Sequence, residues 1–411
     1  MPSGSSLGIV SDSEGRHVVV WIFRCNCEAL LKKPEVFDEL EENVFDFISE
    51  LQKPGRVGRY LPCKNGYTKY GESAELGLSC FALKIFHLFR WWDRLPTSNK
   101  DEWVSFINSY LVDSAEPGLE YFHAYLDPVL VNYLRRPSLG RSISRLRSTS
   151  IHEFLRFRYR KTEPLPYEKA IIAETKQAIA TLAEIGAHRK SRFSAFPQTP
   201  EDVSDYMSKF DWALPWNAGG QTASLAVFLS VQAPKFLSPL FVGQLRDKMG
   251  QHYRNLADKD SGGYFADLKP SRSMLINGGM KVLTALDWLD EPIHFPEKLI
   301  DTVLHDPPVS EGCDLVDAIY VLFRCVGQSN HRRKEVEGYL LKCAESIRQH
   351  ARDDGGFSYS RNRAQKWYYG MPISTGLREG DLHGTLLLCW ALIMVAKVCF
   401  PGEHNWETIR P

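Results

Sequence analysis

The sequence predicts an all-α fold in which helices form a closed double ring, and three observations favour it. Amphipathic stretches alternate with nearly wholly apolar ones, as expected for an outer and an inner layer of helices. Loops rich in glycine and aromatic residues join the two kinds, and the same plan recurs along the chain. No strand-rich region is apparent. We therefore expect an α/α toroid with apolar inner helices and amphipathic outer helices.

The composition is that of an ordinary globular protein. Of 411 residues, 44% are hydrophobic and 24% charged, which is enough for one large toroidal domain over residues 1–411. The net charge is zero, so nothing points to nucleic acid or a membrane surface. The longest apolar run, 386–396, is shorter than the roughly 18–20 residues that span a bilayer. Nine scattered cysteines suggest reduced thiols, and no secretory pattern opens the chain, so we expect a cytoplasmic protein.

The N-terminal part sets out the first helix pair. Residues 17–31 are apolar and fit either a short strand or a short helix before Pro34. Residues 36–51 carry apolar side chains at spacings of three and four, which predicts an amphipathic helix. After a loop with three tyrosines, residues 75–92 are almost wholly apolar and predict an inner helix.

The remaining helices follow the same alternation. Amphipathic or long helices are expected at 103–111, 166–187, 239–256, 297–304 and 334–350. Inner helices are expected to begin near Glu75, Gln221, Met280, Asp314 and Asp381. A sixth pair could come from the region before Leu51 or from the surroundings of the insertion described next.

A basic segment interrupts the pattern at about 135–165. Between Arg135 and Lys161 there are eight arginines and one lysine against a single acid, Glu153. One interpretation is a solvated, flexible insertion. The other is a clamp for an anionic group, or for the acidic face of a partner protein.

Three short motifs resemble a known superfamily. Asp260-Ser-Gly-Gly-Tyr264 and Asp353-Asp-Gly-Gly-Phe357 each precede an apolar helix. They are similar to the repeats shared by protein prenyltransferase β subunits and squalene or terpenoid cyclases. Asp381-Leu-His383-Gly-Thr385 resembles the Asp-x-x-His-Thr segment that opens the last inner helix of the prenyltransferases. The resemblance is best over 239–400, and it implies an α/α toroid more strongly than it implies a reaction.

The resemblance also suggests a metal site. The superfamily carries its chemistry at the start of the inner helix before the last, which here is Glu311-Gly-Cys313-Asp314. Cyclases have Asp-x-Asp-Asp there, and a thiol with a pKa near ~8.5 cannot replace the middle acid in protonating an alkene. Prenyltransferases have Asp-x-Cys, whose residues bind zinc. The implied zinc ligands are Glu311, Cys313 and His383, although Cys313 also fits a small buried hydrophobe.

Other candidate site residues lie in the loops and at the helix starts. For catalysis we single out His383, Asp381 and Tyr369, which could move protons. For substrate binding, aromatic rings, amides and loop arginines are the candidates: Trp216, Asn217, Gln221, Tyr264, Asn277, Arg361, Arg363, Trp367, Tyr368 and Arg378. The amides equally fit helix caps, the aromatic rings ordinary packing, and the arginines a solvated loop.

Three functions remain open at this stage. The leading hypothesis is an enzyme, prenyltransferase-like or terpenoid cyclase-like, acting on an isoprenoid-type substrate, with or without a diphosphate, in the central cavity. The alternative is a carbohydrate-active toroid enzyme, a polysaccharide lyase, epimerase or hydrolase, that uses His383 and Tyr369 as acid and base. The third is a non-catalytic scaffold that binds a partner through segment 135–161. The shape and polarity of the cavity should separate them.

Overall fold

The computed structural model describes residues 6–11, 17–22, 33–112, 123–135, 166–188, 190–309 and 312–411. The chain separates into two compact units, Met1–Glu35 and Val36–Pro411. In the first unit, β1 (Ser6–Ser11) and β2 (His17–Ile22) form an antiparallel hairpin in which Ser6 pairs with Ile22. Of the two alternatives that the sequence left open for the stretch after His17, the structure has the strand.

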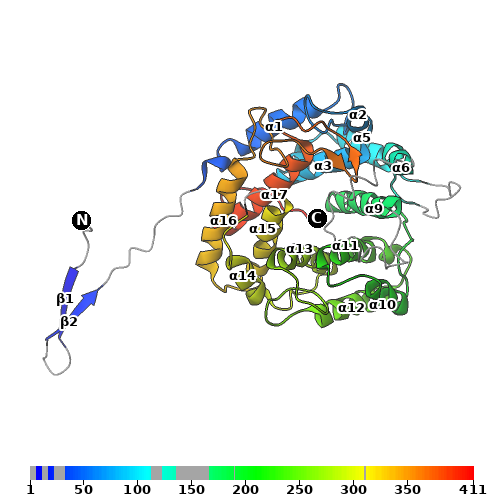
Figure 1. Cartoon of the computed structure of the whole chain (residues 1–411). Helices are drawn as coiled ribbons and strands as arrows, with labels where there is room; N and C mark the ends of the chain where they lie inside the picture. The colour runs from blue at the N-terminus through cyan, green and yellow to red at the C-terminus, as the bar shows by residue number, and fades with distance from the viewer. Residues whose placement is uncertain are drawn as a thin grey trace. The chain divides into compact units, whose positions relative to one another are not determined.

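In the second unit, six inner helices form a closed ring (Figure 1). They are α3 (Leu76–Leu88), α9 (Pro166–Glu184), α11 (Pro215–Val231), α13 (Arg272–Leu289), α15 (Cys313–Val326) and α17 (Leu382–Cys399). Each packs on the next in this order, and α17 packs back on α3. The predicted α/α toroid is thus the fold of this unit. The sixth inner helix is α9, directly after the basic segment.

The outer layer covers this ring. Its helices include α1 (Leu40–Leu51), α5 (Thr97–Asn108), α6 (Pro128–Arg135), α10 (Pro200–Ser208), α12 (Pro239–Leu256), α14 (Pro296–Leu304) and α16 (Arg333–Arg348). The helices α12, α14 and α16 each contact two consecutive inner helices, while α5 packs on α3 and α6 on α9. Short elements complete the unit: α2 (Lys69–Ser73), α4 (Trp91–Arg94), η1 (Glu35–Phe37), η2 (Ala233–Lys235), β3 (Trp367–Tyr368) and β4 (Met371–Pro372).

The last inner helix, α17, is longer than the apolar run that marked it in the sequence. Its 18 residues are long and apolar enough, by length and composition, to cross a membrane, and it is the one such helix in the described part of the chain. In the ring it packs against α3, α15 and α16, and 78% of it is buried. An all-round apolar surface is what an inner helix of a double ring requires.

Two inner helices begin earlier than the sequence predicted. The helices α11 and α13 start at Pro215 and Arg272, not near Gln221 and Met280. Their Gly-Gly pairs therefore lie within helices and do not open them. A Cβ atom at Gly219 would lie 2.8 Å from Cβ of Lys281, and one at Gly278 would lie 2.6 Å from Cβ of Pro215. These glycines allow α11 and α13 to pack with their backbones unusually close.

The Gly-Gly motifs after α12 and α16 do form turns, as predicted. At these turns Ala257 pairs with Tyr264 and Ala351 with Phe357. Gly355 has a φ of 85°, which glycine adopts without strain. The chain makes the same kind of pairing after α1 and α5, to Tyr60 and to Tyr125, without a Gly-Gly pair. The repeat is therefore more regular in space than in sequence.

The C-terminal segment closes one end of the ring, and Figure 1 shows the C-terminus at the ring's centre. The amide of Glu407 donates to the carbonyl of Leu88, and the amide of Arg410 donates to Glu184 Oε1. Nε1 of Trp288 donates to the carbonyl of Pro411. These contacts lie at the C-terminal ends of α3, α9 and α13. The opposite end of the ring is the one where the inner helices begin.

Candidate functional site

His383 lies in the first turn of α17, at the end of the ring where the inner helices begin. Its ring is held between two aromatic rings, with centroids 4.6 Å from Phe81 and 5.6 Å from Tyr359. Nδ1 is buried and has no hydrogen-bond partner among the described residues. Burial, with Lys281 and Lys84 nearby, lowers the pKa of His383 to about 4. At neutral pH it is therefore an uncharged imidazole that can accept a proton.

Cys313 faces the same aromatic stack from the start of α15. Its Sγ lies 2.9 Å from the hydroxyl of Tyr359, and burial raises the pKa of this thiol. Glu311, the third proposed zinc ligand, lies outside the described residues. Within the described part of the chain, no three His, Cys, Asp or Glu side chains are grouped closely enough to hold a metal ion. Zinc binding by Glu311, Cys313 and His383 therefore stays a prediction.

Asp314 links α15 to α13. Its Oδ1 accepts a 2.7 Å hydrogen bond from Nδ2 of Asn277, and its Oδ2 accepts one from Ser273. Asn277 therefore does not cap α13, as the sequence had allowed. The side chain of Ser271 caps that helix instead. The contact brings an amide and a carboxylate together at the open end of the ring.

Asp317 is a candidate site residue that the sequence analysis missed. It lies one turn after Cys313, is 3% exposed, and its Oδ2 has no hydrogen-bond partner. Burial raises its pKa to about 7, against the opposing effect of Lys281. A buried, unpartnered carboxyl group costs folding free energy, so such groups are concentrated at functional sites. The signal that could have found it is an acid inside the apolar run that follows Asp314 in α15.

Three lysines lie on different inner helices. Lys84 lies in α3, Lys176 in α9 and Lys281 in α13. Burial lowers the pKa of Lys84 and, with Lys84 and Lys281 nearby, lowers that of Lys176 well below its ordinary value. Lys281 also acts on Cys313, Asp317 and His383. Lys281 is thus the cation common to the surroundings of Cys313, Asp317 and His383.

The hairpin β3–β4 carries the predicted aromatic residues Trp367, Tyr368 and Tyr369. The hydroxyl of Tyr368 donates to Oε1 of Glu174 in α9, and its ring is buried. Tyr369 has a φ of 46° and precedes Gly370 in the tight turn, where asparagine or glycine is usual. It is 40% exposed, yet burial raises its pKa. Tyr369 therefore keeps its proton at neutral pH and is a weaker acid than an ordinary tyrosine.

Asp381 is buried and structural in its contacts. It caps α17 by accepting from the amide of Gly384 at 2.7 Å, and it also accepts from the amides of Tyr359 and Gln365. These bonds join α17 to the loop that carries Tyr359. Burial raises the pKa of Asp381 to about 6. Its carboxylate is thus engaged with the backbone, and the catalytic candidate of this region is His383.

The remaining predicted residues divide into two groups. Trp216 is 48% exposed and lies 6.0 Å from Nζ of Lys281, so it borders the site, with Asn217 and Gln221 following in the same helix. Tyr264 is fully buried, and its hydroxyl contacts His294, so it packs below the turn and does not line the opening. Arg361, Arg363 and Arg378 lie in the loop beside the hairpin, with Arg363 and Arg378 exposed. Most of the basic segment lies outside the described residues.

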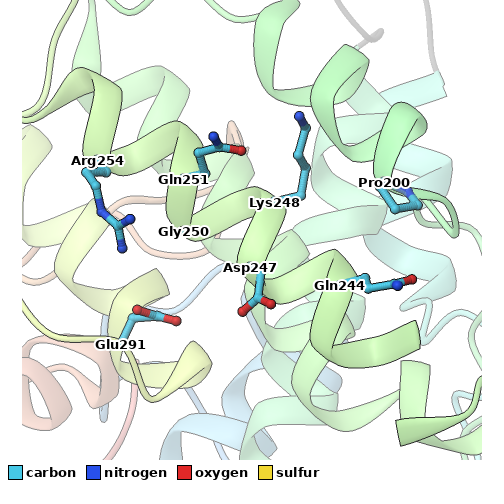
Figure 2. Close-up of a pocket in the computed structure, with 8 residues that line it drawn as sticks. All are labelled: Pro200, Gln244, Asp247, Lys248, Gly250, Gln251, Arg254 and Glu291. Carbon is cyan, nitrogen blue, oxygen red and sulfur yellow. The ribbon is translucent and has the colours of Figure 1, made fainter. Parts of the chain in front are cut away.

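A separate groove of about 590 Å³ lies on the outside, along α12 (Figure 2). Its lining is polar: Pro200, Gln244, Asp247, Lys248, Gly250, Gln251, Arg254 and Glu291. Acidic and basic side chains alternate on this open face, with Arg254 and Glu291 on one side of it. It lacks the unpartnered buried groups of the ring interior, so we place the chemistry in the interior.

Comparisons with known proteins add little to this description. No family model matches the chain, and no curated protein matches it. Among solved structures, the chain is similar to a GH76 α-mannanase of Bacteroides thetaiotaomicron, determined as a selenomethionine derivative. The identity is 10% and the TM-score 0.41, over 88% of this chain and 94% of that one. So distant a likeness carries no argument about function, and the fold assignment depends on the helix contacts alone.

Proposed function

We propose that this protein is an enzyme that acts on a carbohydrate at the open end of the helix ring, by general acid–base catalysis. The observation that carries the proposal is the pair His383 and Asp317. Their surroundings move the two pKa values in opposite directions, to about 4 and about 7. Between these values the imidazole is neutral and the carboxyl group largely protonated. Such a separation is typical of an acid–base pair.

In this proposal His383 accepts a proton from the substrate and Asp317 donates one. The stacked rings of Phe81 and Tyr359 hold the imidazole in one orientation, and Tyr359 also contacts Cys313. Lys281 influences both members of the pair, which supports their action on one bound molecule. The assignment differs from the sequence prediction, which named His383 and Tyr369 as acid and base.

The lining favours a carbohydrate over an isoprenoid chain. Amide side chains of Asn217, Gln221 and Asn277 can bind hydroxyl groups, and none of them is buried. Trp216 and Trp367, 48% and 54% exposed, can stack on sugar rings at the rim. An isoprenoid site would instead be deep and apolar.

One observation keeps the isoprenoid alternative as a second candidate. A cyclase needs a protonated carboxylic acid inside the ring, and the sequence offered only Cys313 in that position. Asp317, one turn later, is a carboxyl group whose pKa burial raises to about 7. Even so, three lysines lie nearby, and a carbocation would be disfavoured beside ammonium groups.

Activity assays decide between these candidates. We would measure release of reducing ends or unsaturated products from neutral and acidic polysaccharides, and cyclisation or transfer with prenyl diphosphates. We expect turnover of a polysaccharide, lowered roughly 10²–10⁴-fold by His383→Ala and by Asp317→Asn. Asp260→Asn, an exposed change, is the matched control. Turnover of prenyl substrates alone would reverse the proposal, and no turnover on any substrate would favour the scaffold.

The pH dependence of kcat/KM tests the assignment of the pair. We expect a bell-shaped profile that falls below about pH 4, as His383 gains a proton, and above about pH 7, as Asp317 loses one. Asp317→Asn should remove the upper limb. An upper limb that survives in this variant would assign the acid to another residue.

A further inference from the structure

The imidazole of His383 is held without a hydrogen bond to its buried nitrogen. In an acid–base histidine, one ring nitrogen is usually fixed by a carboxylate or a carbonyl group, which sets the direction of the other. Among the described residues, Nδ1 of His383 has no such partner. The ring lies instead nearly parallel to two aromatic rings, at 21° to Phe81 and 13° to Tyr359. Its orientation therefore depends on stacking.

Tyr359 is fixed at both ends, so its ring is a rigid surface for this imidazole. At the backbone, its amide donates a 2.7 Å hydrogen bond to Oδ2 of Asp381, the residue that caps α17. At the tip of the side chain, its hydroxyl lies 2.9 Å from Sγ of Cys313, at the start of α15. The phenol ring cannot leave His383 without breaking the contact to Cys313.

We propose that Tyr359 is a positioning residue for the base His383, and that Cys313 acts through Tyr359 by fixing its ring against the imidazole. This inference rests on the proposed function, in which His383 accepts a proton. The stack confines the imidazole to one plane, and the thiol keeps the stacked phenol in place. The base is then oriented before the substrate arrives, which lowers the entropic part of the barrier. Cys313 thereby has a role other than that of a zinc ligand.

Nuclear magnetic resonance can locate the imidazole without any turnover. In protein with isotope-labelled histidine, the signal that disappears in His383→Ala is that of His383. Nuclear Overhauser effects from this signal to the ring of Phe81, whose centroid is 4.6 Å away, report that the stack is in place. We expect these effects to be lost in Tyr359→Leu, because the imidazole is then free to turn. Their persistence at full strength in this variant would overturn the proposal.

Kinetics on the substrate that the wild type turns over separate the ring from its hydroxyl. Tyr359→Leu should lower kcat roughly 10²-fold, the usual effect of a misplaced catalytic group, with little change in KM. Tyr359→Phe keeps the ring and should lose only about 10-fold in kcat. Tyr125→Phe is the matched control, because the hydroxyl of this buried tyrosine donates to Asn108, away from His383. A higher KM with unchanged kcat would make Tyr359 a substrate contact and overturn its positioning role.

A double-mutant cycle tests the part played by the thiol. Cys313→Ala and Tyr359→Phe remove the same contact, so their combination should lower kcat no further than either change alone. Cys313→Ser retains a hydrogen-bonding group beside the phenol and should recover most of the kcat. Effects of the two changes that multiply would mean that Cys313 does not act through Tyr359, and would overturn that part of the inference.

The outcome is distinct from that of the proposed function. Full turnover in His383→Ala would refute the proposed base and, with it, this role of Tyr359. Turnover that is abolished in His383→Ala and unchanged in Tyr359→Leu would refute the positioning role alone.

Discussion

Two buried acids lie near the starts of α15 and α17, and they differ in what surrounds them: Asp317 is one turn into α15, and Asp381 is the N-cap of α17. Asp317 and Asp381 are 3% and 2% exposed, and burial raises the pKa of both, to about 7 and about 6. Asp381 accepts from three backbone amides. Oδ2 of Asp317 accepts from nothing.

This difference separates a structural acid from a functional one. Backbone amides stabilise the charged form of Asp381 and, in return, Asp381 fixes the loop at Tyr359 and the start of α17. Asp317 makes no such contribution to the fold, so its burial is a net cost to stability. Acids that destabilise the fold in this way are concentrated at functional sites. Three predictions test the distinction.

The largest effect should appear when Asp317 is replaced by the uncharged Asn. The folded pKa of about 7 lies above the ordinary value of 3.8, so the carboxyl group stabilises the fold fully below pH 4. This contribution is lost as pH rises through 7, because ionisation is easier in the unfolded chain. We expect Asp317→Asn to match the wild type near pH 4 and to exceed it by about 4 kcal/mol at pH 8.

Urea unfolding of both proteins between pH 4 and pH 8 measures this difference. His383, whose lowered pKa destabilises the fold as pH falls from 6.5 to 4, is present in both and cancels. For the control Asp260→Asn, the difference in unfolding free energy from the wild type should not change with pH. If Asp317→Asn is less stable than the wild type at pH 8, the carboxylate has a stabilising partner and the contrast with Asp381 fails.

Replacement of Asp381 should lower the free energy of unfolding, by less than replacement of Asp317 raises it. Asp381→Ala removes the cap of α17 and leaves the amides of Gly384, Tyr359 and Gln365 without an acceptor in a buried place. We expect a loss of about 3 kcal/mol in the free energy of unfolding. Asp381→Asn retains one acceptor oxygen and should lose less. Thermal unfolding, followed by circular dichroism at pH 7, measures both.

Activity adds a second readout for the same variant. Below its melting temperature, Asp381→Ala should keep part of its turnover, because His383 and Asp317 remain. Full stability combined with complete loss of activity would instead make Asp381 catalytic, as the sequence analysis proposed, and would break the comparison.

The fold was predictable because its signals are local. An apolar helix with no polar face, such as α17, has to lie in an inner layer, and the turns at Gly262 and Gly355 follow outer helices as expected. The starts of α3, α15 and α17 were predicted near Glu75, Asp314 and Asp381, and each helix begins within one residue of these positions. The hairpin β1–β2 was missed because short apolar runs fit either structure.

The site was harder to predict because its signals are not local. Asp317 lies within an apolar helix, and only the fold reveals that its carboxyl group lacks a partner. The three lysines are 92 and 105 residues apart in the chain. The Gly-Gly pairs of α11 and α13 were taken for helix starts because glycine usually signals turns. Their role is to let α11 and α13 pack closely. That role depends on two segments at once, so neither segment shows it alone.

The smallest expected change in stability comes from replacing those glycines. It also bears on Asp317, because Gly219 packs against Lys281. A Cβ atom at Gly219 would press on Cβ of Lys281, which is fixed to the backbone of α13, whereas one at Gly220 would meet nothing within 4 Å. We expect Gly219→Ala to lose about 1 kcal/mol through overpacking. Gly220→Ala, its neighbour in the same helix, should gain about 0.5 kcal/mol from the better helix propensity of alanine.

Denaturant unfolding of the two variants measures the pair, and the pH profile of activity extends it to the acids. Lys281 lowers the pKa of Asp317, whereas the main influences on the pKa of Asp381 are burial, three backbone hydrogen bonds and Glu379. Moving Lys281 away should therefore raise the pKa of Asp317 and shift the upper limb of the profile to higher pH in Gly219→Ala, and not in Gly220→Ala. Equal stabilities and equal profiles would mean that α11 and α13 are not packed through Gly219. Lys281 would then not be held beside Asp317 by that contact.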